Sequence, residues 1–229
     1  MPEISQAAAL SFREAVDRKS LHEHYANLSQ QADASKLGMW IFLATEVMFF
    51  GGMITGYVAY RNAYPAAFEA GSVHMLFLAG TLNTAILITA SLFVALAVHA
   101  ARQGRNKALV WFLAISMFLG ICFLAIKGYE YYDHYVEHKV PTRSFQWDGP
   151  DARHAEMFFV LYFFLTGFHA IHMIVGVSIL AVIVYFARKG RYTPEYHNPV
   201  ENAALYWHFV DIVWIFLYPM LYLVGHTHV

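Results

Sequence analysis

Five ionisable side chains stand inside long apolar stretches of this sequence: Glu46, His169, His172, His208 and Asp211. An ionisable group in hydrocarbon costs about 3 kcal/mol or more, so it normally faces protein and has a partner there. Carboxyl and imidazole groups in such a place can hold or pass on a proton, and imidazoles can also ligate a metal. These five residues are therefore the first candidates for chemistry.

Glu46 lies about ten residues into the first apolar stretch, roughly 14 Å along a helix at 1.5 Å per residue. That depth is near the middle of a bilayer, and the neighbours Met48, Phe49 and Phe50 are apolar. Such surroundings favour the neutral carboxylic acid. The position predicts a proton-linked carboxylate, and the alternative is a hydrogen-bonded structural residue at a helix interface.

The histidines occur at spacings that place them on shared helix faces. His169 and His172 are three residues apart, as are His208 and Asp211. Two stacked haems need histidines about four turns apart on each of two helices, which this spacing does not provide. A single metal held by His169, His172 and His208 is an alternative, but hydrogen bonding between helices is favoured. We therefore expect an intramembrane polar network of these three histidines with Asp211, and no metal.

Composition places the chain in a membrane. Of its 229 residues, 59% are hydrophobic and only 14% are charged, whereas about a quarter are charged in soluble domains. The net charge of −1 gives no indication of nucleic-acid binding. The single cysteine, Cys122, excludes an internal disulfide, a Cys-x-x-Cys redox pair and an iron–sulfur site.

Hydropathy predicts an all-α fold, a polytopic membrane helix bundle with five transmembrane helices. Each apolar stretch is near the ~20 residues that a bilayer needs. A polar cytoplasmic N-terminal arm is expected over residues 1–35, and the membrane domain over residues 36–229. The expected spans are residues 37–60, 75–99, 108–127, 155–186 and 203–224. The third span is expected to continue as a polar helix to about residue 138.

Lysine and arginine predict the orientation. Ten of them lie in the N-terminal arm and in the loops after the second and fourth spans, and five lie on the other side. The positive-inside rule then places the N-terminus in the cytoplasm and the C-terminus outside. Glu130 and Glu156 are expected to be interfacial acids at the outer edge. Arg188 ends the fourth span on the inner side, so Arg188 and the aromatic Trp207 are candidates for lipid contact.

Five short motifs, met in order along the chain, resemble the subunit III family of the haem-copper oxidases. They are TEVMFFG at 45–51, LNT at 82–84, YEY at 129–131, TGFHAIHMIVG at 166–176 and WHFVDIVW at 207–214. The likeness is greatest to the subunit III of cytochrome c oxidase and covers residues 37–223. The first 35 residues carry no such likeness.

The resemblance implies an accessory subunit of an aerobic terminal oxidase in a bacterial inner membrane. Such a complex oxidises cytochrome c, reduces oxygen to water and pumps protons, with its haems and copper ions in subunits I and II. The family's subunit III packs against subunit I, contacts subunit II, binds phospholipid and supports proton uptake, and the complex can join a respiratory supercomplex. Longer members have seven spans with lipids between the first two helices and the other five, and this sequence corresponds to the last five.

Two alternatives stay open at this point. One is the matching subunit of a quinol oxidase, or a nitric-oxide-reductase accessory protein. A copper-binding cysteine pair in the co-purifying subunit II would favour cytochrome c as the electron donor. The other is a proton-coupled transporter that uses Glu46, although transporters commonly show internal repeats and broken helices at midplane, and the sequence shows neither.

The charge distribution generates a test of orientation. A reporter that is active only in the cytoplasm, fused after Val229, should be silent, because the positive-inside rule places that end outside. Fused to the loop after Arg102, the same reporter should be active, which controls for expression. Activity after Val229 would overturn the predicted orientation.

Overall fold

The computed structural model describes residues 28–142, 145–149, 151–194 and 196–226. The prediction for most of the N-terminal arm falls outside these ranges. Within them every regular element is a helix, with no strand. Five helices are long and apolar enough to cross a membrane, which confirms the predicted five-span, all-α fold. They are α2 (Leu28–Ala63), α4 (Phe77–Arg102), α5 (Asn106–Val136), α6 (Ala152–Arg188) and α7 (Asn198–Tyr218).

The helices run beyond the predicted apolar spans. Helix α2 begins at Leu28, inside the stretch expected to be a polar arm, because no proline or glycine interrupts residues 28–37. Helix α5 continues past Lys127 to Val136, as expected, and ends just before His138, whose φ of 54° is left-handed. Helix α6, with 37 residues, is longer than a bilayer requires.

Three short elements are absent from the sequence prediction. A short helix, α3 (Pro65–Val73), follows α2; Pro65 suits its first turn and Phe68 is fully buried. At the other end of the chain, α7 gives way at Pro219 to a π-helical turn, Pro219–Leu223, and then a 3₁₀ turn, Val224–His226. Proline has no backbone N–H to donate, so the regular α-helical ladder cannot continue through it.

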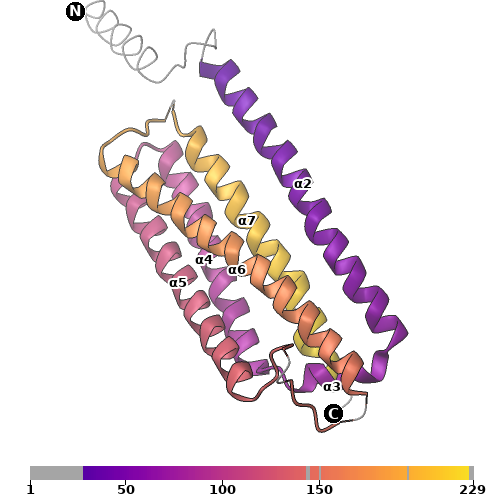
Figure 1. Ribbon diagram of the computed structural model, residues 1–229. Coiled ribbons are helices and arrows are strands. Elements are labelled where there is room, and N and C mark those ends of the chain that lie inside the picture. Colours follow the sequence, from indigo (N-terminus) through magenta and orange to yellow (C-terminus); the bar gives the residue numbers. More distant parts are fainter. Residues whose placement is uncertain (1–27, 143–144, 150, 195, 227–229) are drawn as a thin grey trace, which may run out of the picture.

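Helix α7 lies at the centre of the bundle. It packs against α4 and α6, while α5 closes the far side by packing against both of those helices. Helix α2 rests on α7 and α6 and stands apart from the other four (Figure 1). In its most apolar window α7 has 56% of its residues buried, whereas α2 has 11%. The structure is therefore a four-helix bundle with a peripheral fifth helix.

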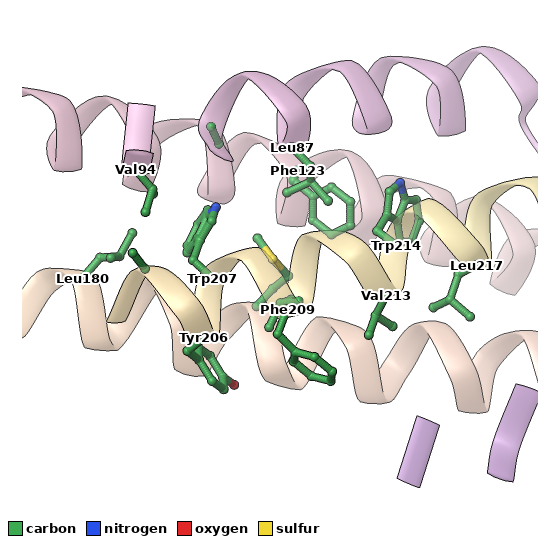
Figure 2. Close-up of a cluster of buried hydrophobic side chains, with 14 of the residues drawn as sticks. Leu87, Val94, Phe123, Leu180, Tyr206, Trp207, Phe209, Val213, Trp214 and Leu217 are labelled. Carbon is green, nitrogen blue, oxygen red and sulfur yellow. The ribbon is translucent and has the colours of Figure 1, made fainter. Parts of the chain in front are cut away.

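Trp207 of α7 fills the centre of the apolar core (Figure 2). Its ring lies against Gly120 of α5 and Gly176 of α6, where a larger side chain would meet the indole. About two turns further along α7, Trp214 packs edge-on against Phe123, with ring centroids 4.8 Å apart. Small residues facing large aromatic rings let the helices approach closely, as is typical of membrane bundles.

This packing predicts that Gly120→Ala destabilises the bundle. A Cβ at residue 120 would lie 2.9 Å from the Trp207 ring, which is 2% exposed and cannot move away. We expect a loss of about 1–3 kcal/mol of unfolding free energy, typical of overpacking. Gly128→Ala is the matched control on the same helix, because its Cβ would meet nothing within 4 Å. Thermal unfolding in detergent should separate the two variants, and equal stability would contradict this account of the core.

Candidate functional site

Glu46 and His172 form an ion pair or hydrogen bond between α2 and α6. Glu46 Oε2 lies 3.1 Å from His172 Nε2. Both side chains are mostly buried, at 19% and 15% exposed. Each is more than a dozen residues from the ends of its helix, so the pair lies deep in the membrane-spanning part. The structure thus gives the predicted intramembrane acid a specific partner.

The protonation of this pair follows from the second nitrogen of the imidazole. His172 Nδ1 lies 2.8 Å from the carbonyl oxygen of Phe168. A carbonyl oxygen only accepts, so Nδ1 must carry a proton. The contact at Nε2 then needs one further proton, held either by the Glu46 carboxyl or by the imidazole. The pair therefore shares a single proton in two arrangements, neutral acid with neutral imidazole or carboxylate with imidazolium.

Aromatic side chains enclose the pair. Phe50 of α2 packs edge-on against the His172 ring at 5.1 Å, and Phe49 packs against Phe168 at the same distance. From α7, the hydroxyl of Tyr206 donates to the backbone carbonyl of His172 at 3.2 Å. These contacts fix the position of the imidazole and keep its surroundings apolar. In the charged arrangement, each of the two groups is therefore stabilised mainly by the opposite charge of the other.

His169 lies in different surroundings from His172. Its ring is fully buried between Phe123 of α5, at 5.5 Å, and Trp214 of α7, at 5.1 Å. Neither ring nitrogen has a hydrogen-bond partner among the described residues. The expectation that His169 joins a polar network therefore does not match the structure. The two histidines are three residues apart on α6, yet they face different neighbours. His172 faces α2, whereas His169 faces the bundle core.

His208 and Asp211 face α4. Ser91 Oγ of α4 lies 2.6 Å from His208 Nδ1. The second oxygen of Asp211, Oδ1, is buried without a partner. The four residues of the predicted network thus divide among three helix interfaces, because α7 is surrounded by other helices. In the described ranges no group of three or more His, Cys, Asp or Glu is placed to hold a metal ion.

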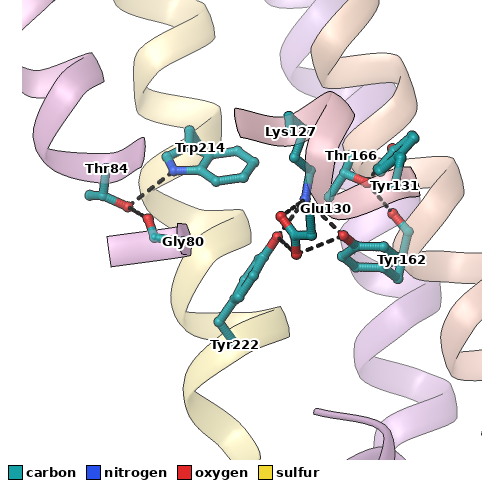
Figure 3. A network of polar contacts seen from close by, with 9 residues as sticks. All are labelled: Gly80, Thr84, Lys127, Glu130, Tyr131, Tyr162, Thr166, Trp214 and Tyr222. Carbon is teal, nitrogen blue, oxygen red and sulfur yellow. Dashed lines mark hydrogen bonds and ion pairs between the residues drawn. The ribbon is translucent and has the colours of Figure 1, made fainter. Parts of the chain in front are cut away.

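A charged cluster lies inside the bundle, between α5, α6 and the turn after α7 (Figure 3). Lys127 and Glu130 of α5 are 3% and 0% exposed and form a salt bridge of 3.1 Å. Lys127 also donates to the hydroxyls of Tyr162, at 2.9 Å, and of Tyr222. Those two hydroxyls donate in turn to Glu130 Oε1, at 2.8 and 2.7 Å.

The cluster satisfies its members completely. The three ammonium protons of Lys127 reach three acceptors, and each tyrosine oxygen both accepts from Lys127 and donates to Glu130. The expectation that Glu130 is an interfacial acid is wrong, because α5, α6 and the turn after α7 enclose it. The Lys127–Glu130 spacing of three residues on one helix face was the available signal.

One end of each of three helices, α2, α4 and α7, meets at Glu201. This carboxylate lies 2.8 Å from Arg102 of α4, 3.2 Å from Lys36 of α2 and 3.2 Å from His197. Beside it, the amide of Asn202 donates to Ser35 Oγ at 2.7 Å. These bonds attach the start of α2 to α7, although little of the rest of α2 is buried.

The two lipid candidates from the sequence fall in different places. Arg188 lines an open pocket of about 310 Å³ at the end of α6, with Lys107 and the exposed Trp111 of α5. Neither Arg188 nor Lys107 has an ion-pair partner among the described residues. Trp207, in contrast, is 2% exposed inside the bundle, which does not fit a lipid-facing role. Its aromatic surface serves packing against the two glycines instead.

The fold and these polar groups define a class, a polytopic helical membrane protein with ionisable groups paired inside the bundle. The model of the family described as cytochrome c oxidase subunit III matches residues 4–226. The chain belongs to this family. It is therefore a subunit III of an oxidase, a component of an oxidoreductase complex built with other oxidase subunits.

Individual relatives agree with the family match. The chain is 34% identical to a cytochrome c oxidase subunit 3 of Synechocystis sp. over 203 residues, covering 88% of this chain and 79% of the relative. It is 30% identical to the subunit 3 of Sus scrofa over 219 residues, covering 92% and 77%. With the subunit 3 of Formosania lacustris it shares 34% identity over 195 residues, covering 82% and 68%.

The buried cluster predicts a strong effect of Glu130→Gln. Without the carboxylate, the Lys127 ammonium stays buried and uncompensated, which typically costs about 3–5 kcal/mol of unfolding free energy. Tyr222→Phe should cost less, about 1–3 kcal/mol, because it removes one hydroxyl and keeps the ion pair. The double variant Lys127→Met/Glu130→Leu should recover most of the loss. The measurement is thermal unfolding of the detergent-solubilised protein.

Glu137→Gln is the matched control at the C-terminal end of α5. Glu137 is 46% exposed and pairs with Lys139, whose hydrogen bond lowers the pKa of this carboxyl below its ordinary value. An exposed pair contributes about 1 kcal/mol or less. If Glu130→Gln and Glu137→Gln were equally stable, the Lys127–Glu130 pair would not be a structural requirement.

Proposed function

We propose that this chain is a non-catalytic subunit III of a proton-pumping cytochrome c oxidase, and that its Glu46–His172 pair is a proton-holding site. The haems and copper ions of the complex lie in subunits I and II, and this chain contributes none. It packs chiefly against subunit I, contacts subunit II and stabilises the complex. Its membrane is the bacterial inner membrane, with the N-terminus in the cytoplasm.

The observation that carries the proton-holding role is the contact between Glu46 and His172. The bond of His172 Nδ1 to Phe168 leaves one shared proton at Nε2, so that proton can sit on either group while the hydrogen bond is kept. Both groups are slightly exposed, unlike Lys127 and Glu130. A proton can therefore reach the pair from a partner subunit or from water, whereas the sealed cluster serves structure.

Phospholipid binding forms the second part of the proposal. Arg188 and Lys107 present two positive charges without partners beside the exposed Trp111, at the inner edge of the membrane. Basic pockets between helices on the cytoplasmic side are suited to anionic head groups, and tryptophan favours the interface. Retained lipid would cover apolar helix faces and so preserve the active lifetime of the oxidase.

Assembly tests the oxidase assignment directly. Purified in mild detergent, the chain should carry with it haem-containing subunit I and a subunit II with a copper-binding cysteine pair. The complex should oxidise reduced cytochrome c. Purification without haem absorbance would contradict the proposal, and oxidation of quinol alone would change the electron donor.

Substitutions at the pair test its proton role. Glu46→Gln keeps the shape and a hydrogen bond but removes the exchangeable carboxyl proton, so assembly and oxygen reduction should persist. Proton uptake at alkaline pH, or the number of turnovers before inactivation, should fall. His172→Gln should have the same effect, and the double variant should be no worse than either single variant, because the two groups act as one site.

The measurement is steady-state turnover against time, with proton release, in liposomes. Glu156→Gln is the control, because this acid of α6 is half-buried and has no ion pair among the described residues. Immediate loss of electron transfer in Glu46→Gln would contradict the accessory role. Unchanged proton uptake and lifetime in both variants would make the pair a purely structural contact.

A further inference from the structure

Helix α2 is held to the rest of the bundle chiefly near its two ends. Near its start, Lys36 pairs with Glu201 of α7 at 3.2 Å. Near its other end, the hydroxyl of the fully buried Tyr57 donates to the carbonyl oxygen of Met220 at 2.7 Å. Between these contacts α2 stands apart from the other helices (Figure 1), and in its most apolar window only 11% of its residues are buried. The few contacts in the middle of α2 therefore decide how closely it lies against the bundle.

The middle of α2 contacts the bundle along one narrow stripe. Leu43 and Phe50 are buried there, and Glu46 lies between them at spacings of three and four residues, on the same helix face. The structure describes the whole of residues 37–56, and in that stretch the bond of Glu46 to His172 is the one polar side-chain contact that reaches another helix. The threonine hydroxyls of the stretch bond to the backbone of α2 itself.

The bond of Glu46 to His172 exists only while the pair holds a proton. His172 Nδ1 donates to the carbonyl oxygen of Phe168, so in the neutral imidazole Nε2 has no proton of its own. Once the pair has lost its shared proton, the Glu46 carboxylate and Nε2 both present lone pairs and cannot hydrogen-bond. The other tautomer would restore the contact at Nε2, but it would turn a lone pair of Nδ1 toward the Phe168 carbonyl. Deprotonation therefore breaks one of the two bonds of the imidazole.

The bond to α2 is the one that gives way. The bond to Phe168 lies within α6, four residues back along the same helix, and it is the shorter of the two, at 2.8 Å against 3.1 Å. The backbone at His172 is fixed by Tyr206 of α7, whose hydroxyl donates to its carbonyl oxygen. Glu46, in contrast, is carried by the peripheral helix. Separation of α2 from α6 thus costs less than a rearrangement inside the bundle.

The sign of the pH dependence follows from the same groups. As pH falls, a second proton gives an imidazolium and a neutral acid, and Nε2–H then donates to a carboxyl oxygen, so the contact is kept. As pH rises, the shared proton is lost, and the contact is lost with it. The other titratable groups that interact with the pair are Tyr206 of α7 and His169, one turn away on α6. Among the described residues no Lys, Arg, Asp or second Glu forms an ion pair with it, so no neighbouring charge replaces the lost proton.

We propose that Glu46 and His172 form a pH-sensitive latch, closed while they hold a proton, that releases the middle of α2 from α6 as pH rises. The latch regulates the proton-holding site of the proposed function and rests on that site for its role in the oxidase. With α2 released, water reaches both groups and returns the proton, and the latch then closes. Loss and return of the proton are thereby coupled to a movement of α2.

Glu46→Gln separates the latch from other effects of pH. The amide of glutamine donates to His172 Nε2 whether the pH is neutral or alkaline, so the contact no longer depends on a titrating proton. Helix α2 should then stay against α6 as pH rises. His172→Gln is a second variant with the same expectation, because its amide can donate to the Glu46 carboxylate and accept from the neutral acid. Both variants keep a polar partner between the two helices, so both should assemble.

The experiment measures the distance between spin labels on α2 and α6 by pulsed electron paramagnetic resonance as a function of pH. The labelled sites are Met48→Cys on α2 and Ile174→Cys on α6, which are 77% and 54% exposed. The full-length chain, with Cys122→Ser, is purified with its accompanying subunits and placed in nanodiscs. Raising the pH should shift the distances reversibly to longer values. The same labels in Glu46→Gln and in His172→Gln should show no shift.

Labels at Leu92→Cys on α4 and Phe118→Cys on α5, 57% and 65% exposed, are the matched control inside the four-helix bundle. Their distance should not change over the same pH range. A distance between α2 and α6 that is the same at every pH would overturn the proposal. So would a shift that persists in Glu46→Gln, because it would have another origin, or an equal shift between α4 and α5, because the whole bundle would then be loosening.

The labels report the position of α2 whether or not the complex takes up protons. A latch that opens as expected in a complex whose proton uptake and lifetime are unaffected by Glu46→Gln would contradict the proton-holding role and leave the latch standing. Altered proton uptake in Glu46→Gln without any pH-dependent movement of α2 would support the proton-holding role and overturn the latch.

Discussion

The closed contact of Lys127 and Glu130 with two tyrosines is the constraint on which the bundle depends. Neither charge can be placed in hydrocarbon alone, and each is satisfied only when α5, α6 and the turn after α7 are all in place. The cluster therefore specifies the packing of these elements as well as stabilising it. Trp214 and Tyr162 add their ring faces to the ammonium, at 5.4 and 4.6 Å.

The bundle contains two kinds of charged pair, with different consequences. Lys127–Glu130 is sealed and fully hydrogen-bonded. Glu46–His172 is slightly exposed, joins the peripheral α2 to α6 and holds a single shared proton. These contacts fix α2 at two points, to α7 at Glu201 and to α6 at His172.

Hydropathy and motif order predicted the five spans, although α2 begins at Leu28 and not near the expected residue 37. They could not predict which helix His172 faces, because a spacing of three residues fixes a shared face and leaves the neighbour undetermined. Glu130 was predicted to lie at the membrane interface because it stands beyond the apolar part of its span in the sequence. In the structure its side chain is buried, because α6 and the turn at Pro219 cover it. Helix α3 and the π-helical turn depend on tertiary contacts that periodicity does not contain, such as the bond from Tyr57 to the carbonyl of Met220.

The central position of α7 has a consequence for how the chain is made. The ribosome synthesises the chain from its N-terminus, so α4, α5 and α6 enter the membrane before their shared core element exists. Before Trp207 and Trp214 are synthesised, Gly120 and Phe123 of α5 lack the indole rings that they contact in the folded protein. Lys127 and Glu130 gain the hydroxyl of Tyr222 later still, because Tyr222 is synthesised after α7. A chain released before Tyr222 would keep an unsatisfied ion pair in the membrane, a defect that membrane quality control can recognise.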